Sequence, residues 1–278
     1  MHWSIAVGIS LLLALQFSYI YTLNDLEIDS FCPNNDNVCL NNDKPSYFCK
    51  KKWDEPNARC SNFQFIHLSA SNKEKFLSGH NGIRNKIAVD FNIANMNNVY
   101  WSQKLEQMAA YYVHECLMQK DECKLRSEFF RLNQNFIFRK RSLADHWPVR
   151  AVRHWYLEIE TDLGSWEEFL NERKNRNMEN FTQMIWPPLE YIGCSAAKMF
   201  DGYFILCNYY PPHDVENYKS VVEFGEPCSI CTNRTGCSQI FGGLCGIDIT
   251  IEKSYNPKPH FYLILSNILT IYFFQILK

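Results

Sequence analysis

Glu179-Asn-Phe-Thr-Gln-Met-Ile-Trp186 is the stretch that decides the fold, and Phe204-Ile-Leu-Cys-Asn-Tyr-Tyr-Pro211 follows it after a short interval. Side chains of the first stretch alternate with a period of two and are rich in aromatic, aliphatic and β-branched residues, a pattern typical of a strand. The second stretch has the same character and carries Cys207, with Cys194 a short loop upstream. We therefore predict two antiparallel strands, joined by a disulfide, at the centre of a small sheet.

These two stretches resemble the signature segments of the CAP superfamily, which contains cysteine-rich secretory proteins, insect antigen 5 allergens and plant pathogenesis-related proteins. The family's first signature, Gly-His-Phe/Tyr-Thr-Gln-Met-Val-Trp, corresponds to residues 179–186. Its second, Cys-Asn-Tyr-x-Pro-x-Gly-Asn, corresponds to residues 207–214. The resemblance implies an α+β fold: a three-layer α-β-α sandwich that is rich in disulfides.

Composition limits the possible classes of protein. The chain has 278 residues, of which 46% are hydrophobic, enough for a sizeable core. Lys plus Arg (28) nearly balances Asp plus Glu (30), so net charge gives no sign of binding to nucleic acid or to an anionic membrane. Twelve cysteines indicate an oxidising compartment and a disulfide framework, because cytosolic thiols are kept reduced.

Five segments are expected along the chain. The apolar run Ile5–Phe17 has the length of a signal-peptide core, so we predict a signal peptide over 1–22. The others follow in order: a cysteine-rich segment (23–65), the CAP domain (66–222), a hinge-like four-cysteine extension (223–250) and a hydrophobic tail (251–278). The tail is interpreted as a removable lipid-anchor signal, a membrane span or a packing segment. We expect an extracellular protein, either free or anchored at the cell surface.

Three helices are expected between the cysteine-rich segment and the strands. Ser71 and Glu74 form a capping box ahead of helically spaced apolar residues that continue to Ile87. A second helix runs from Trp101 to Cys116, and a third covers residues 145–160. His80 lies on the first of these helices and suggests catalysis, but we favour a histidine that is hydrogen-bonded into the core.

The resemblance to antigen 5 proteins also implies a set of disulfides. The implied pairs are Cys32–Cys49, Cys39–Cys123, Cys60–Cys116 and Cys194–Cys207. Sequence leaves the pairing of Cys228, Cys231, Cys237 and Cys245 open; two structural disulfides are favoured there over a zinc or redox site. Asn233-Arg-Thr235 is an exposed-looking glycosylation sequon, whereas Asn180-Phe-Thr182 is placed in a strand.

Many CAP proteins line a central cleft with two histidines and two acidic residues, and some bind a divalent metal there. The motifs place Lys120, Gln134, Glu158 and Asn180 at these four positions. A protonated lysine has no lone pair to offer a metal, and the two amides are weak neutral ligands. We therefore predict a degenerate cleft without metal or other cofactor, with Glu158 and Lys120 as an ion pair.

One alternative keeps a site in the cleft, because His154 lies four residues before Glu158 on the same predicted helix. We favour an ordinary surface pair over a rebuilt metal site. There is no G-x-S-x-G motif and no spare cysteine if all twelve pair, so we assign no catalytic residue and predict that the chain is not an enzyme. The predicted function is binding of a protein partner or a small apolar ligand; the alternatives are a sterol or lipid carrier and a hydrolase with an unrecognised site.

Overall fold

The computed structural model describes residues 55–121, 133–140, 142–159, 166, 168–169, 178–212, 218–232 and 236–248. Its elements are β1 (Gln64–Ile66), α2 (Ala70–Asp90), β2 (Tyr100–Trp101), α3 (Gln103–Val113), β3 (Asn133–Arg139), α4 (Trp147–Tyr156), α6 (Glu179–Met184), β4 (Tyr191–Met199), β5 (Gly202–Tyr210) and α7 (Tyr218–Val221). The predicted signal peptide and hydrophobic tail lie outside these residues. Among the described helices, none has the length and apolar character needed to cross a bilayer.

The sheet is mainly antiparallel, with strands in the order β1-β4-β5-β3, and the short β2 adds to β4 in parallel. The β4–β5 hairpin is its centre, and Cys194 lies directly opposite Cys207 in that pairing. The two cysteines are bonded, with Cα atoms 4.0 Å apart. The disulfide therefore joins the two strands that fill the middle of the sheet.

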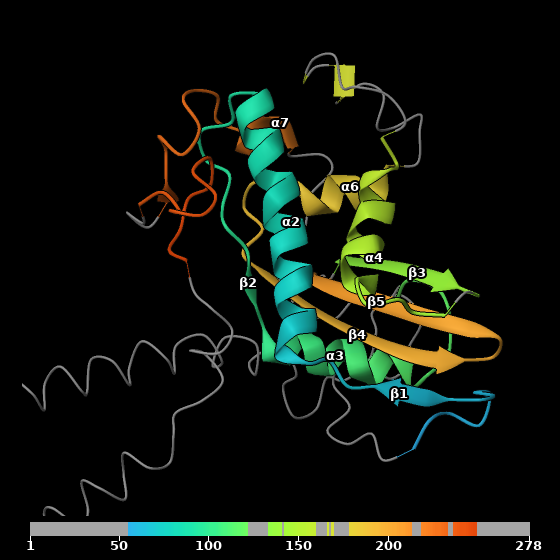
Figure 1. The fold of residues 1–278 in the computed structure, drawn as a ribbon. Helices are drawn as coiled ribbons and strands as arrows, with labels where there is room; N and C mark the ends of the chain where they lie inside the picture. The colour runs from blue at the N-terminus through green and yellow to red at the C-terminus, as the bar shows by residue number, and fades with distance from the viewer. Residues whose placement is uncertain are drawn as a thin grey trace, which may run out of the picture.

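Helices cover both faces of the sheet (Figure 1). The larger core lies between the sheet and α2, α4 and α6, where Phe76, Trp155 and Phe181 pack against Ile205. A smaller core lies on the other face, where α3 packs against Phe204 and its neighbours. This arrangement is the three-layer α-β-α sandwich that the sequence predicts.

The prediction of a strand at residues 179–186 is wrong, because residues 179–184 form α6. The side chains from Phe181 to Met184 are all buried, whether they are polar or apolar. A segment that is buried on every side carries no information about which face points inward, so its alternation fits a short helix equally well. Here Thr182 turns its hydroxyl back to the carbonyl of Met178, a helical contact.

Two helix starts also differ from the sequence prediction. Ser69, not Ser71, caps α2, because its hydroxyl accepts a hydrogen bond from the Asn72 amide at 3.2 Å. Trp101 belongs to β2, and Ser102 caps α3. The third predicted helix is α4, which is shorter than expected and carries a proline in its first turn.

Arg84 on α2 is fully buried and connects the helix to segments far along the chain. Its guanidinium donates to five carbonyl oxygens, those of Asn97, Met184, Trp186, Pro187 and Leu189. Four of these carbonyls belong to the end of α6 and the turn that follows it. Since two consecutive prolines break regular structure in this turn, the carbonyls need a donor from elsewhere.

We expect Arg84→Met to destabilise the protein by about 3–5 kcal/mol, because it leaves several buried carbonyls without a donor. Urea unfolding followed by circular dichroism measures the change. The matched control is Lys86→Gln, which removes a cation from the same helix but from an exposed pair with Asp90; its expected effect is within about 0.5 kcal/mol. Equal stabilities for the two variants would refute the role given to Arg84.

Candidate functional site

The candidate site lies where α4 ends and α6 begins. Glu158 follows α4 by two residues, and its carboxylate accepts hydrogen bonds from the side-chain amide of Asn180 and from the backbone amide of Phe181. The second of these is 2.9 Å long. No residue at the start of α6 caps the helix with its own side chain, so Glu158 supplies a partner for a free amide there. Both oxygens of Glu158 are thus already used within the protein.

Lys120 also reaches this place, but its ion pair is with Glu179 and not with Glu158. The Lys120 ammonium lies 2.8 Å from the Glu179 carboxylate, and both side chains are partly exposed. Lys120 still acts on Glu158 electrostatically. Burial raises the pKa of Glu158, and hydrogen bonds from Phe181 and Asn180, followed by the Lys120 charge, offset part of that rise. The predicted Glu158–Lys120 ion pair is therefore corrected to a Lys120–Glu179 pair beside a capped Glu158.

Gln134 does not join this group. Its side chain donates to Asn208 at 2.9 Å and accepts from the backbone amide of Asp121 at 2.6 Å. Asn208 in turn donates to the carbonyl of Leu105 on α3, so Gln134 belongs to the α3 side of the sheet. The structure thus brings together three of the four residues, Lys120, Glu158 and Asn180, and turns the fourth away.

Asn135, one residue further along β3, points to the opposite face and contacts Asn180. Its amide nitrogen donates to the carbonyl of Asn180 at 2.9 Å and to the Tyr209 hydroxyl at 3.0 Å. Tyr209 is completely buried, and its hydroxyl meets His80 Nε2 at 2.9 Å. A continuous polar chain therefore runs from His80 on α2 through the sheet to Glu158.

Sequence reasoning missed Asn135 and Tyr209 as parts of the site. The available signal was the strand period, because adjacent residues of β3 face opposite layers. Choosing the correct face required knowing that β3 pairs with β5, where Asn135 lies opposite Cys207.

His80 is a core histidine, as burial statistics suggest for a histidine on an apolar helix face. Its Nδ1 lies 2.7 Å from the carbonyl of Phe76, which can only accept, so Nδ1 carries the hydrogen and Nε2 accepts from Tyr209. Burial lowers the pKa of His80 to about 4. The ring is therefore neutral at physiological pH and acts as a structural hydrogen-bonding group.

No hydrogen bond or ion pair joins His154 to Glu158 among the residues that the structure describes. The His154 side chain is exposed on α4. Its pKa is lowered first by partial desolvation and then by the charge of Arg139 at the far end of β3. The charged group that acts on His154 is thus a cation, which is unfavourable for metal binding.

The residues of the cleft do not fit a divalent metal. Both oxygens of the Glu158 carboxylate are engaged, and the Glu179 carboxylate is paired with the Lys120 ammonium. Asn180 donates an N–H of its side-chain amide to Glu158, and its amide oxygen is a weak neutral ligand. The set works as a hydrogen-bonded brace between α4 and α6.

Two of the disulfides that the resemblance implies, Cys60–Cys116 and Cys194–Cys207, are present in the structure. The structure also pairs the last four cysteines as Cys228–Cys237 and Cys231–Cys245. Cys32, Cys39, Cys49 and Cys123 lie outside the described residues, as does the sequon at Asn233.

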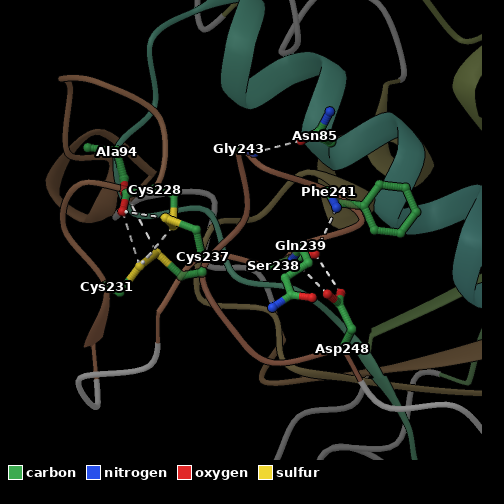
Figure 2. The surroundings of a disulfide bond; sticks show 11 residues. Asn85, Ala94, Cys228, Cys231, Cys237, Ser238, Gln239, Phe241, Gly243 and Asp248 are labelled. Carbon is green, nitrogen blue, oxygen red and sulfur yellow. Dashed lines mark hydrogen bonds between the residues drawn. A yellow bond between two sulfur atoms is a disulfide. The ribbon is translucent and has the colours of Figure 1, made fainter.

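The four-cysteine extension packs onto the end of α2 (Figure 2). The sulfur atoms of Cys228, Cys231 and Cys245 lie within 4.8 Å of one another, a spacing that suits a metal site. Each of them is in a disulfide, however, and a disulfide offers no thiolate ligand. Gly243 donates to the side chain of Asn85 at 2.8 Å and so attaches the extension to α2.

Comparison with known proteins shows which family and which relatives this chain is similar to. Residues 77–209 match the sequence model of the family described as "CAP: Cysteine-rich secretory protein family". Venom allergen 5 of Vespula vidua is 27% identical over 168 residues, which cover 55% of this chain and 80% of the wasp protein. The cysteine-rich venom protein of Tityus serrulatus is 25% identical over 193 residues, or 64% of this chain, but the match spans only 46% of the scorpion protein.

Solved structures of similar fold confirm the predicted fold class. One example is the "Crystal structure of NaASP2 with Zn2+", which aligns with a TM-score of 0.51 at 23% identity and covers 64% of this chain and 97% of that one. At this level of identity the likeness concerns the fold.

The low pKa of His80 predicts a specific loss of stability in acid. Since the folded-state pKa lies below the usual 6.5, the unfolded chain takes up the proton first as pH falls. The stabilisation is full above pH 6.5 and is lost toward pH 4, by roughly 3 kcal/mol in total. We expect His80→Gln to flatten this dependence in urea unfolding at pH 7 and pH 4.5. Equal slopes for variant and wild type would contradict a buried neutral His80.

Proposed function

The domain formed around residues 77–209 belongs to the CAP superfamily, and from that premise we propose that the chain is an extracellular, non-enzymatic binding protein of the antigen 5 type. Its ligand in this proposal is a protein partner or a small molecule with an apolar part. The observation that carries the proposal is the state of Glu158, the one acidic residue kept from the family's tetrad, whose carboxylate is used to cap α6.

Extracellular placement is supported by cysteine chemistry and by the relatives. The described residues contain four disulfides, which persist in oxidising surroundings. Two of the relatives are named as venom proteins. We propose secretion through the signal peptide at 1–22 and leave attachment through the 251–278 tail as a further proposal, which the intact mass of the mature protein would test.

A non-enzymatic role is supported by the same cleft. Hydrolysis needs an activated nucleophile with a base in reach, or a metal with an open coordination position. Both ring nitrogens of the buried His80 are hydrogen-bonded, Nδ1 to the carbonyl of Phe76 and Nε2 to the hydroxyl of Tyr209. The NaASP2 crystal structure is described with Zn2+, whereas here an ammonium and an amide stand near Glu158.

Zinc is expected to leave the melting temperature of the wild-type protein unchanged, because the cleft offers no free ligand set. The matched test is the double variant Lys120→His with Asn180→His, which places two imidazoles beside Glu158. This variant should gain roughly 5–10 °C at zinc concentrations about a hundredfold above its Kd. Differential scanning calorimetry with and without zinc measures both effects.

Adding Glu158→Gln to that double variant is the control and should abolish the gain, since the third ligand is lost. The opposite pattern would overturn the proposal: a zinc-dependent rise in the wild type that Glu158→Ala removes. Reproducible cleavage of a peptide library by wild-type protein, lost on one substitution, would overturn the non-enzymatic part.

A further inference from the structure

A cavity of about 250 Å³ lies between the end of β3, the first turn of α4 and β5. It is distinct from the cleft at Glu158. Asn135, which contacts the cleft, and Arg139, which lines the cavity, are four residues apart on β3, or about 13 Å along an extended strand.

The floor of this cavity is apolar. Ile205 from β5 is completely buried, and Trp147 from the start of α4 is 8% exposed. Leu143, in the loop that precedes α4, is half-buried and lines the same space. An apolar group bound here would remove from water both its own hydrocarbon surface and that of the cavity.

Two arginines, Arg139 and Arg150, are among the residues that line the cavity. Within the described ranges, neither is paired with a carboxylate. The nearest basic neighbour in sequence, Lys140, is already neutralised by Asp201 at 2.8 Å. Two like charges around one small cavity repel each other, and an anion between them would relieve that repulsion.

The wider surroundings have the same sign of charge. Residues 139–154 contain five Lys or Arg and a single acidic residue, Asp145, although the whole chain has a net charge of −2. This segment, of which Arg139 and Arg150 line the cavity, is therefore locally positive, which favours the approach of anions.

We propose that this cavity binds a small organic anion, with a carboxylate held by Arg139 and Arg150 and a short apolar body on the floor formed by Trp147, Leu143 and Ile205. Guanidinium groups suit carboxylates because they donate parallel hydrogen bonds in a planar fork. The volume selects the size of the ligand. Drug-sized ligands occupy pockets of roughly 300–1,000 Å³, so this cavity encloses a short chain or a single ring but not a sterol.

This proposal rests on the binding function proposed above and names the chemical class of its ligand.

The test uses isothermal titration of the full-length protein at low salt with three probes. Hexanoate carries both the head group and the body, acetate carries the head group alone, and hexanamide carries the body without charge. Hexanoate should saturate with a Kd on the order of 1 mM, at least about tenfold tighter than either of the other two.

Three variants test whether hexanoate binds in the cavity or is only attracted by nearby positive charge. Arg139→Gln and Arg150→Gln should each weaken hexanoate binding about tenfold, since a charge-assisted contact is lost. The control is Arg153→Gln, which removes the same charge from an exposed position on α4 that does not line the cavity. Its effect should stay within about twofold.

Three outcomes would overturn the proposal: no saturable binding of hexanoate, equal binding of hexanamide, or equal losses for Arg150→Gln and Arg153→Gln. Circular dichroism of each variant shows whether a loss reflects misfolding. Because the zinc and peptide-cleavage experiments address the cleft alone, failure of this cavity leaves their results standing, and the reverse also holds.

Discussion

The fold depends on a buried cation, Arg84, whose guanidinium binds a cluster of backbone carbonyl oxygens. Arg84 donates to five carbonyl oxygens, most of them at the end of α6 and in the proline-containing turn beyond it. A helix C-terminus concentrates unpaired carbonyls and partial negative charge, so a guanidinium is favourable there. This contact fixes α6 against α2, and β4 begins soon after the same turn.

Once α6 is fixed by Arg84, the chemistry of the cleft follows. Glu158 caps the start of α6, Asn180 bridges Glu158 and Asn135, and Tyr209 passes the chain of hydrogen bonds to His80. These hydrogen bonds join α2, β3, β5 and α6 to Glu158, which follows α4. The cleft therefore braces the fold, and both oxygens of Glu158 are engaged in it. The binding site that we propose, the cavity beside Arg139, lies outside this cleft.

Much of the fold was predictable from sequence because two signature stretches and the helix motifs resemble one family. The local structure of the first signature was not, since residues 181–184 are buried on every side and their alternation has no solvent face to report. The site was predictable only in part. Lys120, Glu158 and Asn180 lie together as predicted, but Asn135, not Gln134, contacts Asn180. The sequence does not show which face of β3 points to the cleft, because that depends on the pairing of β3 with β5. Arg139 ends β3 and Arg150 lies on α4, and they form no motif, so only the fold shows that both line one cavity.

The central claim is that Lys120, Glu158 and Asn180, which the sequence resemblance places at a ligand cluster, form an internal brace here. A crystal structure grown in millimolar zinc, with anomalous scattering recorded at the zinc edge, tests it most directly. The account predicts no anomalous peak between Lys120, Glu158 and Asn180, and an unbroken hydrogen bond from Phe181 to Glu158. A zinc peak bound to Glu158, with Lys120 swung away and α6 uncapped, would contradict it.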